Sequence, residues 1–147
     1  MEAPEYKNIF ENEGSHFFYV ANHKVILSLV KRYTVGKGLK ILDAGCGTGL
    51  LAKRLEQSGD VWGIDINPEA VRFAKKRGVV VKQASVEEIP FESGTFDLVS
   101  CVDVIYHKAV DDKKALREFY RVLKPGGILV LRVPAHPILS TSHDQFV

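Results

Sequence analysis

Three glycines at alternate positions form the most chemically informative stretch of the chain. Gly45, Gly47 and Gly49 follow Asp43 in the run DAGCGTG, and a predicted helix begins directly after it. Glycines at this spacing let the backbone turn sharply and come close to a ligand. The first turn of the following helix offers free N–H groups and the positive end of its dipole. The stretch therefore predicts a binding loop for a small ligand that carries an anionic part.

A second acid, Asp65, stands 22 residues after Asp43, at the end of a predicted strand. An acid at this place can bind the hydroxyls of a ribose, so the ligand is expected to contain a nucleoside. The phosphate-binding pattern GxxxxGK[ST] is absent, because Leu50-Leu-Ala-Lys53 follows the last glycine. The dinucleotide pattern GxGxxG also fails, since the third glycine comes one residue early. A dinucleotide and a smaller adenosine compound both remain open on these residues.

Alternating strand and helix patterns must position this loop. The strands are continuous apolar runs, which is typical of strands covered on both faces, and the alternation implies a parallel sheet. We therefore predict an α/β fold, a Rossmann-like three-layer αβα sandwich with a mainly parallel sheet. The predicted strands are 39–44, 61–66, 79–82, 96–102 and 128–133, and the predicted helices are 50–57, 68–77 and one that begins at Asp111 or Asp112. The stripe predicted on that last helix is Leu116, Phe119, Tyr120 and Leu123.

The N-terminal region is predicted to hold one further helix. Residues 1–15 are polar and are expected to be loosely held, whereas His16–Tyr33 has helical spacing of apolar residues. The apolar face of that helix is predicted to contain Phe18, Ala21, Val25, Leu29 and Tyr33. We divide the chain into a lead-in with its helix, residues 1–37, and a ligand-binding domain, residues 38–147.

Composition excludes several other classes. The chain has 147 residues, and 20 basic against 18 acidic side chains give a net charge of +2, which disfavours a nucleic-acid partner. No run is long enough to span a membrane, and the N-terminus lacks the pattern of a secretory signal. The two cysteines, Cys46 and Cys101, form no disulfide framework, so a cytoplasmic location is expected. No metal-binding pattern is present, and no metal is expected.

Several motifs in order resemble those of class I S-adenosylmethionine-dependent methyltransferases. The resemblance spans about residues 38–134 and is closest to the branch that includes the ubiquinone/menaquinone-biosynthesis methyltransferases. It implies a cofactor, S-adenosylmethionine, and a product, S-adenosylhomocysteine. The motifs are Ile41–Gly49, Gly63-Ile-Asp65, Ile89-Pro-Phe91, Phe96-Asp-Leu-Val99 and Arg121–Gly127.

The resemblance assigns cofactor contacts residue by residue. It implies that the glycine loop, with Cys46 in it, packs on the methionine part and that Asp43 helps to place its amino group. Asp65 is then the ribose-binding acid, and Ile66 packs on the adenine. Ser85 stands where the family usually has an aspartate for the adenine amino group, with Val86 after it and Glu87 as an alternative. Cys101 matches a position that meets the cofactor mainly through its backbone.

The acceptor side departs from the family pattern. The branch often has Asp-Val-Leu-Glu-His after its fourth strand, whereas this chain has Asp103-Val-Ile-Tyr106-His107. Tyr106 is a candidate for lining the acceptor site, or it simply packs. His107 is a candidate general base for an acceptor that must lose a proton, or it is a packing histidine.

The expected function is methyl transfer by in-line displacement to a small-molecule acceptor. A non-catalytic cofactor-binding module with the same fold is the alternative. Strands six and seven of the class I fold have no counterpart before Val147. Strand five is therefore expected to form an exposed apolar edge, through which two copies could form a homodimer.

Overall fold

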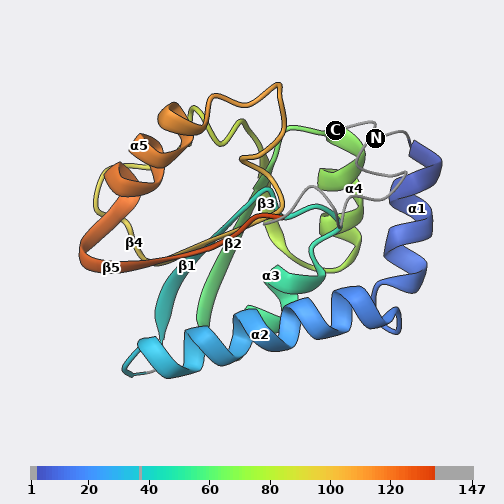
Figure 1. The fold of residues 1–147 in the computed structure, drawn as a ribbon, viewed down its shortest axis with the longest axis horizontal. Helices are drawn as coiled ribbons and strands as arrows, with labels where there is room; N and C mark the ends of the chain where they lie inside the picture. The colour runs from blue at the N-terminus through green and yellow to red at the C-terminus, as the bar shows by residue number, and fades with distance from the viewer. Residues whose placement is uncertain (1–2, 37, 135–147) are drawn as a thin grey trace.

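The computed structural model describes residues 3–36 and 38–134, and all its strands lie in one parallel sheet. The strand order is β3-β2-β1-β4-β5, so β1 lies at the centre with its carboxyl end beside those of β2 and β4 (Figure 1). The strands are β1 (Leu39–Ala44), β2 (Gly59–Asp65), β3 (Val80–Gln83), β4 (Phe96–Val102) and β5 (Leu123–Arg132).

Helices cover both faces of the sheet, which confirms the predicted three-layer α/β fold. Side chains of α2 (Phe17–Tyr33), α3 (Leu50–Leu55) and α4 (Pro68–Lys76) pack in one core cluster with the sheet. Helix α5 (Asp112–Val122) packs on the other face. The first helix, α1 (Ala3–Asn12), lies outside this sandwich and packs on α4 through Tyr6 and Phe10 (Figure 1).

Two helix starts follow directly from local sequence. The side chain of Asn67 accepts a hydrogen bond from the N–H of Glu69 at 2.9 Å, and Pro68 occupies the first helical position of α4. Asp111 caps α5 in the same way, accepting from the N–H of Lys114 at 3.0 Å. Both caps fix where a helix leaves the carboxyl edge of the sheet.

The prediction that the first part of the chain is loosely held was wrong for residues 3–15. Residues 3–12 form helix α1, and Tyr6 and Glu13 are 9% and 5% exposed. The helix is stable because Tyr6 and Phe10, one turn apart, lie on Ala70 and Phe73 of α4.

The predicted apolar faces of two helices were also wrong in part. Helix α2 buries His23, Ile26 and Val30, while Val25 and Tyr33 are 59% and 57% exposed. Apolar side chains surround much of this helix, so spacing alone did not select the buried side. Helix α5 buries Ala115, Phe119 and Val122 and leaves Leu116 and Tyr120 exposed, so the buried stripe lies beside the predicted one and shares only Phe119 with it.

The last strand begins earlier than predicted. Strand β5 starts at Leu123, where α5 ends, and the Pro-Gly-Gly segment forms a bulge in which Phe96 pairs with Leu123 and Leu98 with Ile128. Among the described residues β5 is an edge strand, and its Leu131 is 40% exposed. Dimerisation through this edge stays a prediction.

Within residues 3–36 and 38–134, every helix is too short or too polar to cross a membrane.

Candidate functional site

The glycine loop lies between β1 and α3, at the carboxyl edge of the sheet. All three glycines adopt left-handed backbone angles, with φ of 81° at Gly45, 54° at Gly47 and 84° at Gly49. The N–H groups of Gly45 and Cys46 both donate to the carbonyl of Ile64 on β2, at 2.8 and 2.9 Å. The loop thus turns over the end of β2 and reaches Asp65, as the glycine spacing predicted.

Two of these glycines are also required by close packing. A Cβ on Gly45 would collide with the side chain of Val104. A Cβ on Gly49 would lie 3.0 Å from the Cβ and 3.1 Å from the Cα of Ala74 in α4. No heavy atom lies within 4 Å of a Cβ built on Gly47, so that side of the loop is open among the described residues.

A Gly49→Ala substitution is therefore expected to destabilise the chain by about 3 kcal/mol, from left-handed strain plus overpacking. Gly47→Ala is the matched control, with the same strain and free space, and is expected to cost about 1 kcal/mol. Urea unfolding without any ligand measures both. Equal losses in the two variants would show that the contact with Ala74 has no energetic weight.

Asp65 ties the loop to the start of α4. Its Oδ2 accepts the N–H of Gly47 and its Oδ1 accepts the N–H of Asn67, both at 2.9 Å. Burial raises the pKa of this carboxyl, and the two N–H groups act in the opposite direction. A carboxylate has about four lone-pair sites, so each oxygen can accept a further hydrogen bond from a ligand hydroxyl.

Asp43 is the most deeply buried acid of the site. Its Oδ1 accepts a hydrogen bond from the hydroxyl of Ser100 on β4 at 2.7 Å. Its Oδ2 is buried and makes no hydrogen bond of ordinary geometry among the described residues, although the N–H of Ala52 in α3 lowers the pKa. Burial, opposed by Ser100 and reinforced by the charge of Asp65, raises the pKa to about 6. Sequence reasoning missed Ser100, since a lone serine in an apolar strand has no distinctive pattern.

The residues assigned to the adenine are spread along the edge after β2 and β3. Ile66 is 68% exposed and free to cover a flat ligand group, whereas Val86 is 6% exposed and packs in the core on the α5 side. The Ser85 hydroxyl accepts the N–H of Glu87 at 3.1 Å. The alternative, Glu87, instead accepts the N–H of Asp111 at 3.0 Å. The structure brings Ser85 to the expected edge and directs Glu87 toward α5.

The two cysteines assigned to the cofactor lie on opposite sides of the sheet. Cys46 packs in the cluster with α3, and Cys101 packs, fully buried, in the cluster with α5. Both are free thiols, and burial raises both pKa values, that of Cys101 to about 12. The Cys101 side chain is thus part of the core, which leaves its backbone for any contact with a ligand.

The acceptor candidates follow β4. The ring of Tyr106 stacks on that of His107 at 4.6 Å, and Nε2 of His107 lies 3.1 Å from the carbonyl oxygen of Asp103. Asp103 has a left-handed φ of 56° and pairs with Arg132 at the end of β5. The Arg132 guanidinium in turn lies 5.2 Å from the ring centre of Phe18. Residues from α2, from the segment after β4 and from the end of β5 therefore meet, and Val104 of that segment lies against Gly45 of the glycine loop.

Comparison with known proteins decides the family. Residues 42–131 match the family described as "Methyltransferase domain", which is more than half of the chain. The chain belongs to this family. Its expected class, a class I S-adenosylmethionine-dependent methyltransferase of the ubiquinone/menaquinone branch, is confirmed.

The chain has similar curated relatives. It is 34% identical over 135 residues to the ubiquinone/menaquinone biosynthesis C-methyltransferase UbiE of Idiomarina loihiensis. That match covers 80% of this chain and 53% of the relative. It is 38% identical over 122 residues to a ubiquinone biosynthesis O-methyltransferase of Xanthomonas oryzae, and that match covers 75% of this chain and 51% of the relative. The chain thus spans about half the length of these relatives.

A solved structure supports the fold of the chain. A Methanococcus maripaludis protein described as an S-adenosyl-L-methionine-dependent methyltransferase superposes with a TM-score of 0.77 at 24% identity. The match covers 88% of this chain and 63% of that protein.

The residues of the chain fit the cofactor that the family implies. S-adenosylmethionine carries an ammonium and a sulfonium, and Asp43 presents a buried oxygen that lacks a hydrogen-bond partner of ordinary geometry within the described part of the chain. Asp65 retains lone pairs for ribose hydroxyls, and Gly47 leaves open space beside it. In residues 3–36 and 38–134, no three His, Cys, Asp or Glu side chains group as metal ligands.

Proposed function

We propose that the chain binds S-adenosylmethionine and transfers its methyl group to a small-molecule acceptor of quinone type. The observation that carries the proposal is the joint placement of Asp43 and Asp65 around a glycine loop that Asp65 itself holds. The quinone-type acceptor rests on the names of the relatives, whose products belong to ubiquinone and menaquinone biosynthesis. A reducing, cytoplasmic setting belongs to the proposal, and two buried free thiols agree with it.

The binding roles follow from the positions of the side chains. Asp65 binds the ribose hydroxyls with the lone pairs that remain beside its two N–H donors. The free oxygen of Asp43 accepts from the ammonium, which offsets the cost of its buried charge. Ile66 covers the adenine, and the Ser85 region lies at its edge. These contacts orient the methyl group toward the ends of β4 and β5.

When bound, the cofactor would supply an electrophilic methyl group: an electron pair of the acceptor would form the new bond to the methyl carbon as the C–S bond breaks, and the electrons of that bond would stay on sulfur in S-adenosylhomocysteine. The chain accelerates this step mainly by holding the acceptor in line. An acceptor hydroxyl or ring carbon must also lose a proton, and His107 is the proposed base. Because Nε2 of His107 faces a carbonyl that can only accept, Nε2 carries the proton and Nδ1 holds the free lone pair.

The test combines binding and turnover. Calorimetric titration with S-adenosylhomocysteine is expected to give micromolar affinity. Transfer of labelled methyl from S-adenosylmethionine to a soluble hydroquinone analogue is expected to be lost in His107→Ala with the affinity unchanged. Binding without turnover on hydroquinones, phenols or amines would favour the non-catalytic module. Failure of a folded chain to bind would overturn the proposed function.

A further inference from the structure

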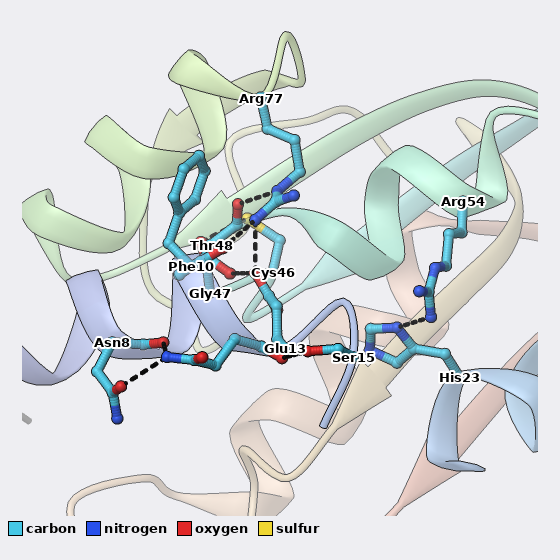
Figure 2. Close-up of polar contacts among 11 residues, drawn as sticks. Asn8, Phe10, Glu13, Ser15, His23, Cys46, Gly47, Thr48, Arg54 and Arg77 are labelled. Atoms are coloured by element: carbon cyan, nitrogen blue, oxygen red, sulfur yellow. Dashed lines mark hydrogen bonds and ion pairs between the residues drawn. The ribbon is translucent and has the colours of Figure 1, made fainter. Parts of the chain in front are cut away.

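A buried carboxylate outside the known motifs contacts the glycine loop. Glu13 lies in the turn between α1 and α2 and is 5% exposed. Its Oε1 accepts hydrogen bonds from the hydroxyl of Thr48 and from Nη2 of Arg77, the latter at 2.6 Å. Thr48 is 35 residues away and Arg77 is 64 residues away in sequence. Figure 2 shows Arg77 and Glu13 converging on Thr48 from opposite sides.

Thr48 is held at both of its polar ends. It lies between Gly47 and Gly49, is 3% exposed, and donates its hydroxyl to Glu13. Its carbonyl accepts a hydrogen bond from Nε of Arg77 at 3.1 Å. The Glu13–Arg77 ion pair therefore fixes the orientation of Thr48. This residue lies between Gly47, which donates to Asp65, and Gly49, which caps α3.

The same ion pair joins the N-terminal helices to the rest of the chain. The Arg77 guanidinium lies 4.3 Å from the ring centre of Phe10 in α1, and its Nη2 reaches the Phe10 carbonyl at 3.4 Å. A second link joins α2 to α3, where His23 and Arg54 form a hydrogen bond of 2.9 Å. Figure 2 shows both links on the two sides of the α1–α2 turn.

Helix α1 also lies close enough to the site to influence it electrostatically. Burial and the negative charge of Asp65 raise the pKa of the Tyr6 hydroxyl to about 12. Two acids from different parts of the chain also accept hydrogen bonds from neighbouring residues of the glycine loop. Glu13 accepts from Thr48, and Asp65 accepts from Gly47.

We propose that Glu13 is a positioning residue of the cofactor site: through Thr48 and Arg77 it holds the glycine loop in its binding conformation, so that docking of residues 3–34 and cofactor binding stabilise each other. The inference rests on the proposed function, since the ligand is the same. Coupling of this kind is reciprocal, so the cofactor must stabilise the docked helices by the factor that docking adds to affinity.

The decisive variant is Thr48→Val, which removes one hydroxyl at nearly constant volume and leaves the Glu13–Arg77 ion pair in place. Calorimetric affinity for S-adenosylhomocysteine is expected to fall about tenfold, the change expected for loss of one charge-assisted hydrogen bond. Thr48→Ser keeps a hydroxyl and is expected to restore most of the affinity. Glu13→Gln is expected to be intermediate, and its effect is expected not to add to that of Thr48→Val.

Glu11→Gln is the matched control, because Glu11 lies on α1 and its ion pair of 3.9 Å with Lys7 is exposed to solvent. Its affinity is expected to equal that of the wild-type chain. Hydrogen exchange supplies the second readout: S-adenosylhomocysteine is expected to slow exchange in α1 and α2 of the wild-type chain and to do so less in Thr48→Val.

The outcomes separate the two proposals. A wild-type chain that fails to bind S-adenosylhomocysteine overturns the proposed function and this inference with it. A wild-type chain that binds, together with unchanged affinity in Thr48→Val or unchanged exchange in α1 and α2, overturns the inference alone. Strictly additive effects of Glu13→Gln and Thr48→Val also overturn it, because the two residues would then act independently.

Discussion

An Asp65→Ala variant is expected to bind S-adenosylhomocysteine about 100-fold more weakly than the wild-type chain. The substitution removes the two charge-assisted hydrogen bonds that we propose Asp65 makes to the ribose, each of about 1.5 kcal/mol or more. It also frees the N–H of Gly47, which Asp65 holds at 2.9 Å, so the loop loses an anchor. Calorimetric titration gives the affinity, and the thermal unfolding curve verifies that the variant is folded.

Asp60→Ala is the matched control for this experiment. Asp60 lies on the same strand as Asp65 but is exposed, at the opposite end of β2. Its removal is expected to leave the affinity unchanged. An Asp65→Ala variant that is folded and binds with wild-type affinity would remove Asp65 from the site.

The second large effect concerns stability. Between pH 4 and pH 7, the stability of Asp43→Asn relative to the wild-type chain is expected to rise by about 2 kcal/mol. The folded-state pKa of Asp43 is raised to about 6 from an unfolded value of 3.8. Between these values the folded chain holds a proton that the unfolded chain has released, so the contribution of Asp43 to stability is present at low pH and is lost as pH rises. An asparagine at this position does not titrate, so its contribution to stability does not change with pH.

Urea unfolding at several pH values measures this difference, and calorimetry supplies the functional counterpart. The same variant is expected to lose most of its affinity for the cofactor, because the neutral amide presents no charge to the ammonium. Asp97→Asn is the control, since the Asp97 carboxyl is only partly buried and its hydrogen bond to Lys124 lowers its pKa. Its relative stability is expected to show no comparable rise over that range. If the stability difference between Asp43→Asn and the wild-type chain did not change with pH, burial would not raise the pKa of Asp43.

Much of the sheet and of the loop was predictable because their signals are local. Strands β1 and β4 have the predicted bounds, since apolar runs between glycines and loops leave little choice of end points. The glycine spacing and Asp65 predicted a shared site for the same reason, and the structure joins them through the hydrogen bond from Gly47 to Asp65, while the nucleoside ligand stays a prediction. The caps of α4 and α5 are likewise set by a single residue each.

The parts that were missed depend on contacts distant in sequence. Glu13 becomes meaningful only once α1 packs on α4, because its partners Thr48 and Arg77 belong to other elements. The face of α2 could not be chosen from spacing, since Val25 and Ile26 are equally apolar and only the packing of α2 on the sheet separates them. The roles of Ser85, Val86, Tyr106 and His107 remain predictions that the binding and turnover experiments address.

The positions of the two cysteines make the chain its own unfolding reporter. Cys46 is in the core on the α3 side and Cys101 is in the core on the α5 side, and both thiols are buried with raised pKa values. Only the thiolate form of cysteine attacks a thiol reagent, so labelling must wait for the corresponding side of the sheet to open. Mass spectrometry of the two labelled peptides therefore times the opening of each layer separately, without any engineered probe, and a ligand that binds the loop containing Cys46 slows labelling of Cys46 first.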